Sequence, residues 1–414
     1  MTAPGSSAAP YDALLLCSFG GPNAEEDVLP FLRNVVRGKG VPEERLAEVG
    51  EHYFAFGGKS PINEQNLALR SALSAELADR GVSLPVLWGN RNWHPYTRDV
   101  LRDAVAFGAR RILVLITSAY ASYSGSRQYR EHLAAAVADL GAEGEELQID
   151  VLRPFFNDPG FIDANVAAIR DAIGEVAGER AAGAQVPMER APAAQVPTER
   201  ATGAQVPGER AQGQQPGGAQ APRDEQGVHV AYVTHSIPTT MQQASAVTGP
   251  GYREQHQDVQ AVIDADLRAA GVTLRSSLSY CSRSGDPRTP WLEPDINDHL
   301  ADLAAQGVSR VVIAPVGFIS DHMEVAWDLQ TEALQTAQDL GLQAACATTA
   351  GTHPAFVAGL VDMVLERAAR ERGQKVQIPL RGQLPAFPDV APPDSCRMRH
   401  GEVTGIPVVA GTAD

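Results

Sequence analysis

Short runs of apolar residues alternate along the chain with longer stretches in which apolar and polar positions recur with helical spacing. The apolar runs are rich in Val, Ile and Leu, and they lie at 13–19, 86–90, 111–117, 147–152, 228–234, 311–319 and 344–349. Stretches such as 252–271 and 296–307 carry the helical pattern and end at glycine. Apolar strands that alternate with helices predict an α/β fold, with parallel sheets covered by helices on both faces.

One segment does not follow this pattern. From 179 to about 215 the motif ERAxxAQVPx repeats every ten residues, and "PGGAQAPRDEQG" follows it. Each copy contains proline and small residues that cannot build a core, and a long surface loop costs little extra closure entropy. We therefore predict a disordered insertion at about 179–226. The proline-rich residues 374–414 are predicted to be disordered for the same reason, and neither segment is expected to carry chemistry.

Composition and charge narrow the class of protein. A length of 414 residues fits two α/β units, and 34 basic against 50 acidic residues give a net charge of −16. This balance argues against binding nucleic acid through a broad basic face. The N-terminus lacks a basic segment followed by a long apolar run, and no stretch has the apolar length of a membrane span. We therefore expect a cytoplasmic protein without membrane insertion.

The four cysteines are far apart in the sequence, at Cys17, Cys281, Cys346 and Cys396. This spacing indicates neither a disulfide framework nor a paired-cysteine metal site. Buried free thiols are the simplest expectation.

Ligands of parallel α/β sheets bind beyond the carboxyl ends of the strands, so the residues that follow each apolar run are the candidates for chemistry. His235 directly follows the run at 228–234. Imidazole accepts protons near neutral pH and is a common metal ligand, although a single histidine is more often structural.

Acidic residues follow the run at 311–319. Glu324, Asp328 and Glu332 recur every fourth residue, which on an α-helix would place three like charges on one face. No Lys or Arg occurs between Arg310 and Arg367 to offset the repulsion. A solvated helix face is one explanation, and a row of oxygen donors for a divalent cation is the other. We expect two sheet ends to place His235 and Glu324 facing each other across a cleft, where they would bind Fe²⁺ weakly.

Seven motifs in order resemble those of the ferrochelatases, the enzymes that insert Fe²⁺ into a porphyrin. They are LLLCSFGGP, HYFAFGGKSPINEQN, TSAYASYSGSRQY, PFFNDPGFI, THSIP, GDPRTPWLEPD and VGFISDHMEVAWD. The resemblance implies two Rossmann-like domains of the chelatase type with a porphyrin cleft between them. The N-terminal domain would comprise 10–117, completed by a C-terminal helix at about 353–372, and the second domain would comprise 118–350.

The resemblance also implies roles for individual residues. His235 would take a pyrrole proton, receive the metal, or do both, and Glu324 would be its partner carboxylate across the porphyrin. Asp328 and Glu332 fall on an acidic ladder that leads metal to the site. Porphyrin contacts are implied for Ser60, Tyr129, Phe19, Arg37, Tyr53, Arg91 and Trp291.

Two departures from relatives restrict the chemistry. Some relatives have a tyrosine that ligates iron at the position of Phe19, and phenylalanine cannot do so. Others bind a two-iron, two-sulfur cluster through four cysteines, but here Ser126 occupies one of those positions and the tail offers only Cys396. We predict no iron–sulfur cluster and no permanently bound cofactor, with Fe²⁺ as a substrate.

The resemblance is greatest to the actinobacterial branch, which acts on the tetracarboxylate coproporphyrin III. We therefore expect a monomer that converts coproporphyrin III and Fe²⁺ to coproheme, and a downstream coproheme-processing enzyme is a candidate partner. Three alternatives stay open at this point: iron insertion into protoporphyrin IX, metal insertion into another tetrapyrrole, and a tetrapyrrole or metal carrier without turnover.

Overall fold

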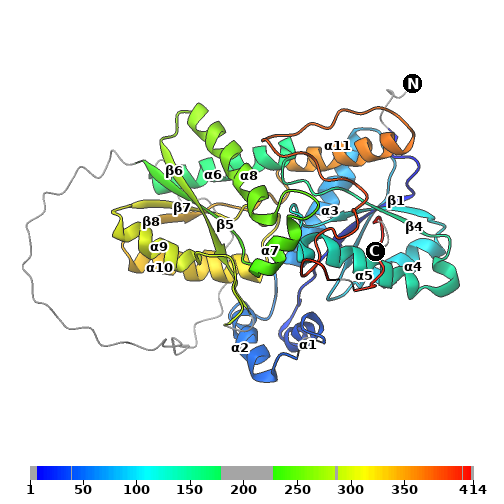
Figure 1. Ribbon diagram of the computed structural model, residues 1–414, viewed down its shortest axis with the longest axis horizontal. Helices are drawn as coiled ribbons and strands as arrows, with labels where there is room; N and C mark the ends of the chain where they lie inside the picture. Colours follow the sequence, from blue (N-terminus) through cyan, green and yellow to red (C-terminus); the bar gives the residue numbers. More distant parts are fainter. Residues whose placement is uncertain (1–6, 39, 179–226, 285–287, 403, 412–414) are drawn as a thin grey trace, which may run out of the picture.

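Two parallel sheets form the centre of the molecule (Figure 1). The computed structural model describes residues 7–38, 40–178, 227–284, 288–402 and 404–411. The first sheet has the strand order β2-β1-β3-β4, and its strands are β1 Ala13–Ser18, β2 Val86–Asn90, β3 Arg111–Ile116 and β4 Gln148–Val151. The second has the order β6-β5-β7-β8, and its strands are β5 Val228–His235, β6 Leu274–Cys281, β7 Arg310–Ala314 and β8 Gln343–Cys346. The predicted fold class is confirmed.

Helices cover both faces of each sheet, as continuously apolar strands require. In β5, Val230 and Tyr232 pack toward the helices at 159–176 and 252–269, whereas Ala231 and Val233 pack toward those at 296–305 and 334–339. The α-helices around the two sheets are α3 Ile62–Asp79, α4 Thr97–Ala106, α5 Gln128–Ala138, α6 Pro159–Val176, α7 Thr239–Ser245, α8 Tyr252–Ala269, α9 Ile296–Ala305, α10 Leu334–Asp339 and α11 Pro354–Glu371. The predicted C-terminal helix is α11, which packs on both α3 and α6.

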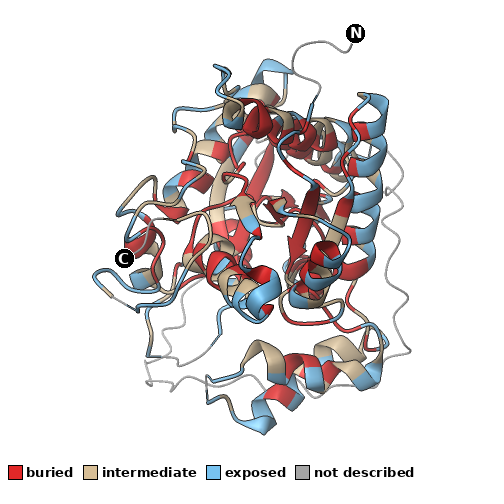
Figure 2. Ribbon diagram, turned by 90° about the vertical axis from the view of Figure 1, so that its right-hand side faces the viewer, coloured by how far each residue is buried: buried red, intermediate tan, exposed pale blue. Residues whose placement is uncertain are grey.

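The other two α-helices, α1 Glu25–Val35 and α2 Glu43–Phe54, form a hairpin that stands apart from the sheets (Figures 1 and 2). Figure 2 shows buried residues along its inner face and exposed residues outside. Its small core includes Val28, Phe31 and Leu46.

The predicted boundary between residues 117 and 118 is wrong. Strand β4 pairs with β3, in the register Arg111↔Gln148 to Val114↔Val151, so the first sheet is complete only at Val151. The apolar run at 147–152 revealed this strand but not the sheet to which it belongs, and α5 provides the crossover that a parallel neighbour requires. The chain enters the second half through α6.

The tail prediction is also wrong over residues 374–402 and 404–411, because this segment packs against both halves; on the second half, Arg381 pairs with Asp266 of α8 at 2.7 Å. Asn157 donates from Nδ2 to the carbonyl oxygen of Leu384 at 3.0 Å, and Arg130 donates from Nη1 to that of Ala410 at 2.5 Å. Phe387 is buried against Phe156. Buried donors from the body thus satisfy backbone carbonyls that a proline-rich segment cannot satisfy internally. The predicted insertion at 179–226 lies outside the described residues.

All four cysteines are buried and free, as predicted. Within the described ranges, no helix has the length and apolar character needed to cross a membrane.

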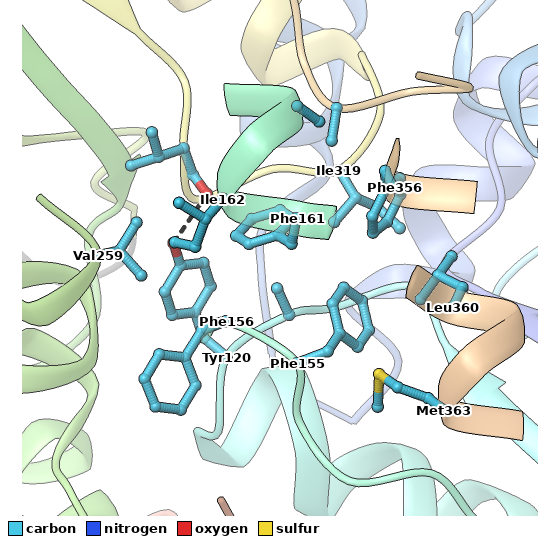
Figure 3. Close-up of a cluster of buried hydrophobic side chains, with 14 of the residues drawn as sticks. Tyr120, Phe155, Phe156, Phe161, Ile162, Val259, Ile319, Phe356, Leu360 and Met363 are labelled. Carbon is cyan, nitrogen blue, oxygen red and sulfur yellow. Dashed lines mark hydrogen bonds between the residues drawn. The ribbon is translucent and has the colours of Figure 1, made fainter. Parts of the chain in front are cut away.

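The largest apolar cluster joins the two halves (Figure 3). Phe161 of α6 is fully buried, with ring centroids 5.9 Å from Phe155, 5.8 Å from Phe356 and 6.1 Å from Tyr120. Tyr120 follows β3, and its hydroxyl donates to the carbonyl oxygen of Val316, which follows β7, at 3.0 Å. Aromatic packing and this hydrogen bond therefore fix one sheet relative to the other.

Replacing Phe161 by Ala should destabilise the protein by about 3–5 kcal/mol, because the change removes a fully buried ring and leaves a cavity. Thermal unfolding of the purified variant would measure the loss as a lower midpoint. Phe107→Ala is the matched control, since that ring is 93 % exposed. Similar midpoints for the two variants would contradict the role assigned to this cluster.

Candidate active site between the two sheets

A cavity of about 430 Å³ lies where the carboxyl ends of the central strands approach each other. Each sheet reverses its strand order beside its central strand, between β1 and β3 and between β5 and β7. Such switch points are where α/β proteins bind ligands. The residues just after these strands line the cavity, together with the hairpin side chains of Phe31, Val35 and Tyr53.

His235 and Glu324 lie in direct contact at this cavity. His235 ends β5, and its Nε2 is 3.3 Å from Oε1 of Glu324, with side chains 33 % and 42 % exposed. Its Nδ1 donates to the carbonyl oxygen of Ser236. This bond fixes the orientation of the ring, so Nε2 is the nitrogen that points to the carboxylate.

The electrostatics favour an ion pair. Burial lowers the pKa of His235, but the charge and hydrogen bond of Glu324 outweigh it and raise that pKa above its usual value. Burial likewise raises the pKa of Glu324, yet the nearby His235 holds it well below the usual range. His322 adds to this effect, with its Nδ1 3.7 Å from Oε2 of Glu324.

The expected position of this pair across a cleft is wrong. Both residues come from the second sheet, because β5 and β7 are adjacent parallel strands whose carboxyl ends meet at one edge. At 3.3 Å they cannot lie on opposite faces of a flat ligand. They therefore form one wall of the cavity, and the first half forms the other.

Glu324 begins a π-helix that extends from Glu324 to Ala333, rather than the α-helix that the spacing suggested. Its wider turn places residues four to five apart on one side, and Thr331 donates from Oγ1 to the carbonyl oxygen of Ala326, five residues earlier, at 2.8 Å. π-Helical turns are rare and occur frequently at functional sites.

The three carboxylates of this helix form a series from the cavity to the surface. Glu324 lines the cavity, Asp328 is half-buried behind it, and Glu332 is exposed. Burial raises the pKa of Asp328 to about 7; the hydrogen bond from Ser282 opposes this shift, and Glu324 and Glu332 add to it. No group of three or more His, Cys, Asp or Glu in the described part of the chain forms a ready metal site. The metal role of the series stays a prediction.

The first half contributes an aromatic and cationic wall. The Arg91 guanidinium lies 5.0 Å from the ring centroids of both Phe19 and Tyr129, and its Nη1 is buried without a hydrogen-bond partner. Burial raises the pKa of Tyr129 to about 12, so the phenol stays protonated. No other Arg or Lys is among the described residues that line the cavity.

Of the other predicted porphyrin contacts, three line the cavity and one does not. Ser60, Tyr53 and Trp291 line the cavity, and Gly21 allows Ser60 to approach, since a Cβ there would lie 2.7 Å from the Cβ of Ser60. Arg37 does not line it: the side chain is exposed and donates to Oδ1 of Asn34 at 2.5 Å. The predicted porphyrin contact of Arg37 stays a prediction.

Sequence reasoning missed a hydroxyl-rich turn on the first half. The π-helical turn Tyr123–Arg127 follows Ser122, whose Oγ accepts from the Gly125 N–H at 2.9 Å, and Ser122, Ser124 and Gly125 all line the cavity. Gly125 is sterically required, because a Cβ there would lie 2.8 Å from the backbone carbonyl oxygen of Tyr120, which cannot rotate away. The serine-rich sequence after the run at 111–117 was the available signal.

Comparison with known proteins identifies the family. A family model described as Ferrochelatase matches residues 11–186 and 211–368. The chain belongs to the ferrochelatase family. The match includes both sheets of this ferrochelatase and the His235–Glu324 pair, which confirms the resemblance found in the motifs.

Curated relatives of this ferrochelatase match over nearly their whole length. Proteins named "Coproporphyrin III ferrochelatase" from Streptomyces coelicolor and Streptomyces griseus are 48 % and 47 % identical to it, over 95 % and 94 % of both chains. One of the same name from Leifsonia xyli is 43 % identical, over 93 % of this chain and 91 % of its own.

If Asp328 delivers metal to Glu324 in this ferrochelatase, Asp328→Asn should raise the apparent KM for Fe²⁺ or Zn²⁺ roughly 10-fold with little change in the KM for porphyrin, as loss of an outer metal-site partner does. Initial rates at varied metal and fixed porphyrin would measure this. Asp339→Asn removes the same charge from an exposed position and should match the wild type. Equal KM values for the metal in both variants would show that Asp328 has no role in metal delivery.

Proposed function

We propose that the protein inserts Fe²⁺ into coproporphyrin III to give coproheme. The observation that carries this proposal is the histidine–carboxylate pair on one wall of a cavity. The other wall holds aromatic rings, hydroxyls and the Arg91 guanidinium, whose Nη1 has no hydrogen-bond partner. The names of the relatives at 43–48 % identity support the choice of porphyrin.

The reaction replaces two pyrrole N–H protons by one Fe²⁺ ion, without oxidation or reduction. In the unloaded site Glu324 holds His235 as an imidazolium. When Glu324 binds the incoming cation this stabilisation is lost, the imidazolium releases its Nε2 proton, and Nε2 can then accept a pyrrole proton. Glu324, Asp328 and Glu332 offer hard oxygen donors to the incoming cation. Because only a few protein ligands would hold the metal at each step, it can be released to the four pyrrole nitrogens.

The opposite wall suits recognition of the macrocycle. Phe19 and Tyr129 offer ring faces, and Arg91 between them offers a nitrogen with no competing partner in the protein. Guanidinium binds carboxylates strongly, and the serine hydroxyls of the turn at 122–126 provide further donors. A tetracarboxylate porphyrin presents more groups to such a wall than a dicarboxylate does.

Replacing His235 by Ala should lower kcat at least about 100-fold, which is the usual contribution of a positioned acid or base. The Soret shift on metallation of coproporphyrin III under anaerobic conditions measures the rate. His400→Ala, at an exposed histidine, is the control and should retain activity. A His235→Ala variant with wild-type rates would refute the proposed chemistry.

The kcat/KM for coproporphyrin III should exceed that for protoporphyrin IX, and Arg91→Met should raise the KM for coproporphyrin III by about 10-fold or more, as loss of a charge-assisted hydrogen bond does. The exposed Arg102→Met variant controls for the change in charge. A preference for protoporphyrin IX would replace the proposed substrate, and an unchanged KM in Arg91→Met would remove Arg91 from the carboxylate site.

A further inference from the structure

The hairpin α1–α2 contacts the π-helix through a pair of stacked rings. His52, in the last turn of α2, lies with its ring centroid 4.4 Å from that of Trp327, and the two planes differ by only 10°. Phe56 meets the same indole edge-on at 6.3 Å. This contact joins the first half of the chain to the helix that carries the carboxylate series.

The stack is one between neutral rings. Burial, and then the charge of Arg45, lower the pKa of His52, so the imidazole carries no proton charge at neutral pH. Both rings are half-buried. Offset stacking of aromatic rings adds stabilisation beyond the apolar area that it buries.

Trp327 lies next to Asp328 and three residues after Glu324, which is less than one turn of the π-helix. Val325, Leu329 and Ala333 pack the other side of this helix into the core of the second half. The π-helical conformation is rare, so side-chain contacts with neighbouring elements decide how this helix is rotated about its axis. His52 supplies such a contact, and it comes from the half that faces the porphyrin.

The residue next to His52 extends this connection to the porphyrin cavity. Tyr53 lines the cavity and packs edge-on against Phe31 at 6.0 Å, and Phe31 lines the cavity as well. Two adjacent residues at the end of α2 therefore face different parts of the site, one the porphyrin cavity and the other the helix of the carboxylate series.

We propose that His52 is a positioning residue for metal delivery. Its stack on Trp327 holds the π-helix in the rotation that aligns Asp328 with Glu324. The neighbouring Tyr53, which lines the cavity, links this alignment to porphyrin docking. The proposal rests on the proposed function, because it assigns the carboxylate series to Fe²⁺. Loss of the stack should weaken handling of the metal, whereas porphyrin binding should persist, since Tyr53, Phe31 and Arg91 remain.

The test uses the full-length variants His52→Ala and His52→Phe, with Glu44→Ala as control at an exposed position of the same helix. For each variant, KM for Zn²⁺ or Fe²⁺ is measured at saturating porphyrin, and the Kd for coproporphyrin III is measured without metal. Zn²⁺ affinity is measured by calorimetry without porphyrin, and thermal unfolding is recorded.

We expect His52→Ala to raise the metal KM and the Zn²⁺ Kd about threefold to tenfold, the range that one aromatic pair supplies, and to leave the porphyrin Kd within about twofold. His52→Phe retains a ring and should restore the metal constants to within about twofold. Glu44→Ala should equal the wild type.

Three outcomes would overturn the proposal. The metal constants of His52→Ala could equal those of the wild type, His52→Phe could fail to restore them, or the porphyrin Kd could rise in parallel with the metal KM, which would indicate a general loss of structure. Failure of the proposed function would give a different result. The wild type would then not metallate coproporphyrin III, but its Zn²⁺ affinity would still depend on His52.

Discussion

The contact between His235 and Glu324 depends on two adjacent parallel strands, β5 and β7, that end at the same edge of one sheet. Parallel pairing sets the direction of both chains, and the change in strand order at β5 leaves a space beyond their carboxyl ends. A histidine that ends the first strand and a helix that begins shortly after the second are thereby brought within 3.3 Å. The ion pair is a consequence of sheet topology, and the mutual pKa shifts follow from it.

The first half supplies the cavity wall opposite His235 and Glu324. Its own switch point, between β1 and β3, carries Phe19 and the serine-rich turn, and the aromatic cluster around Phe161 fixes this half relative to the second. In the proposed function, the His235–Glu324 wall handles the metal, and the first half supplies most of the porphyrin contacts, with Trp291 added from the second half. The hairpin α1–α2 is the exception, because it contacts both the cavity and the π-helix.

Much of the fold and site could be predicted from the sequence. Apolar runs identified seven of the eight strands that the structure describes. They missed β6, whose serine-rich sequence is only partly buried. The residues after the runs included His235, Glu324 and Phe19, since strand ends are where parallel sheets bind ligands. The contact distance and the shared wall could not be predicted, because the order of strands within a sheet is not encoded in any one run. Four-residue spacing likewise suits an α-helix or a π-helix, so Glu324–Ala333 was assigned to the commoner form.

The failures elsewhere have a similar origin. Residues 374–402 and 404–411 look disordered by composition, yet Asn157 and Arg130, far away in sequence, satisfy the carbonyls of Leu384 and Ala410. The contact of His52 with Trp327 gives no local signal at all, because it joins elements that are distant in the chain. Long-range partners, rather than local propensity, decide these regions.

The central claim is that this cavity catalyses metal insertion rather than merely holding a tetrapyrrole or a metal. The most direct measurement is the number of porphyrins metallated per protein, followed by the Soret band with coproporphyrin III and Fe²⁺ in large anaerobic excess. The account predicts steady conversion through many equivalents. Conversion that stops at one equivalent would contradict it and would indicate a carrier.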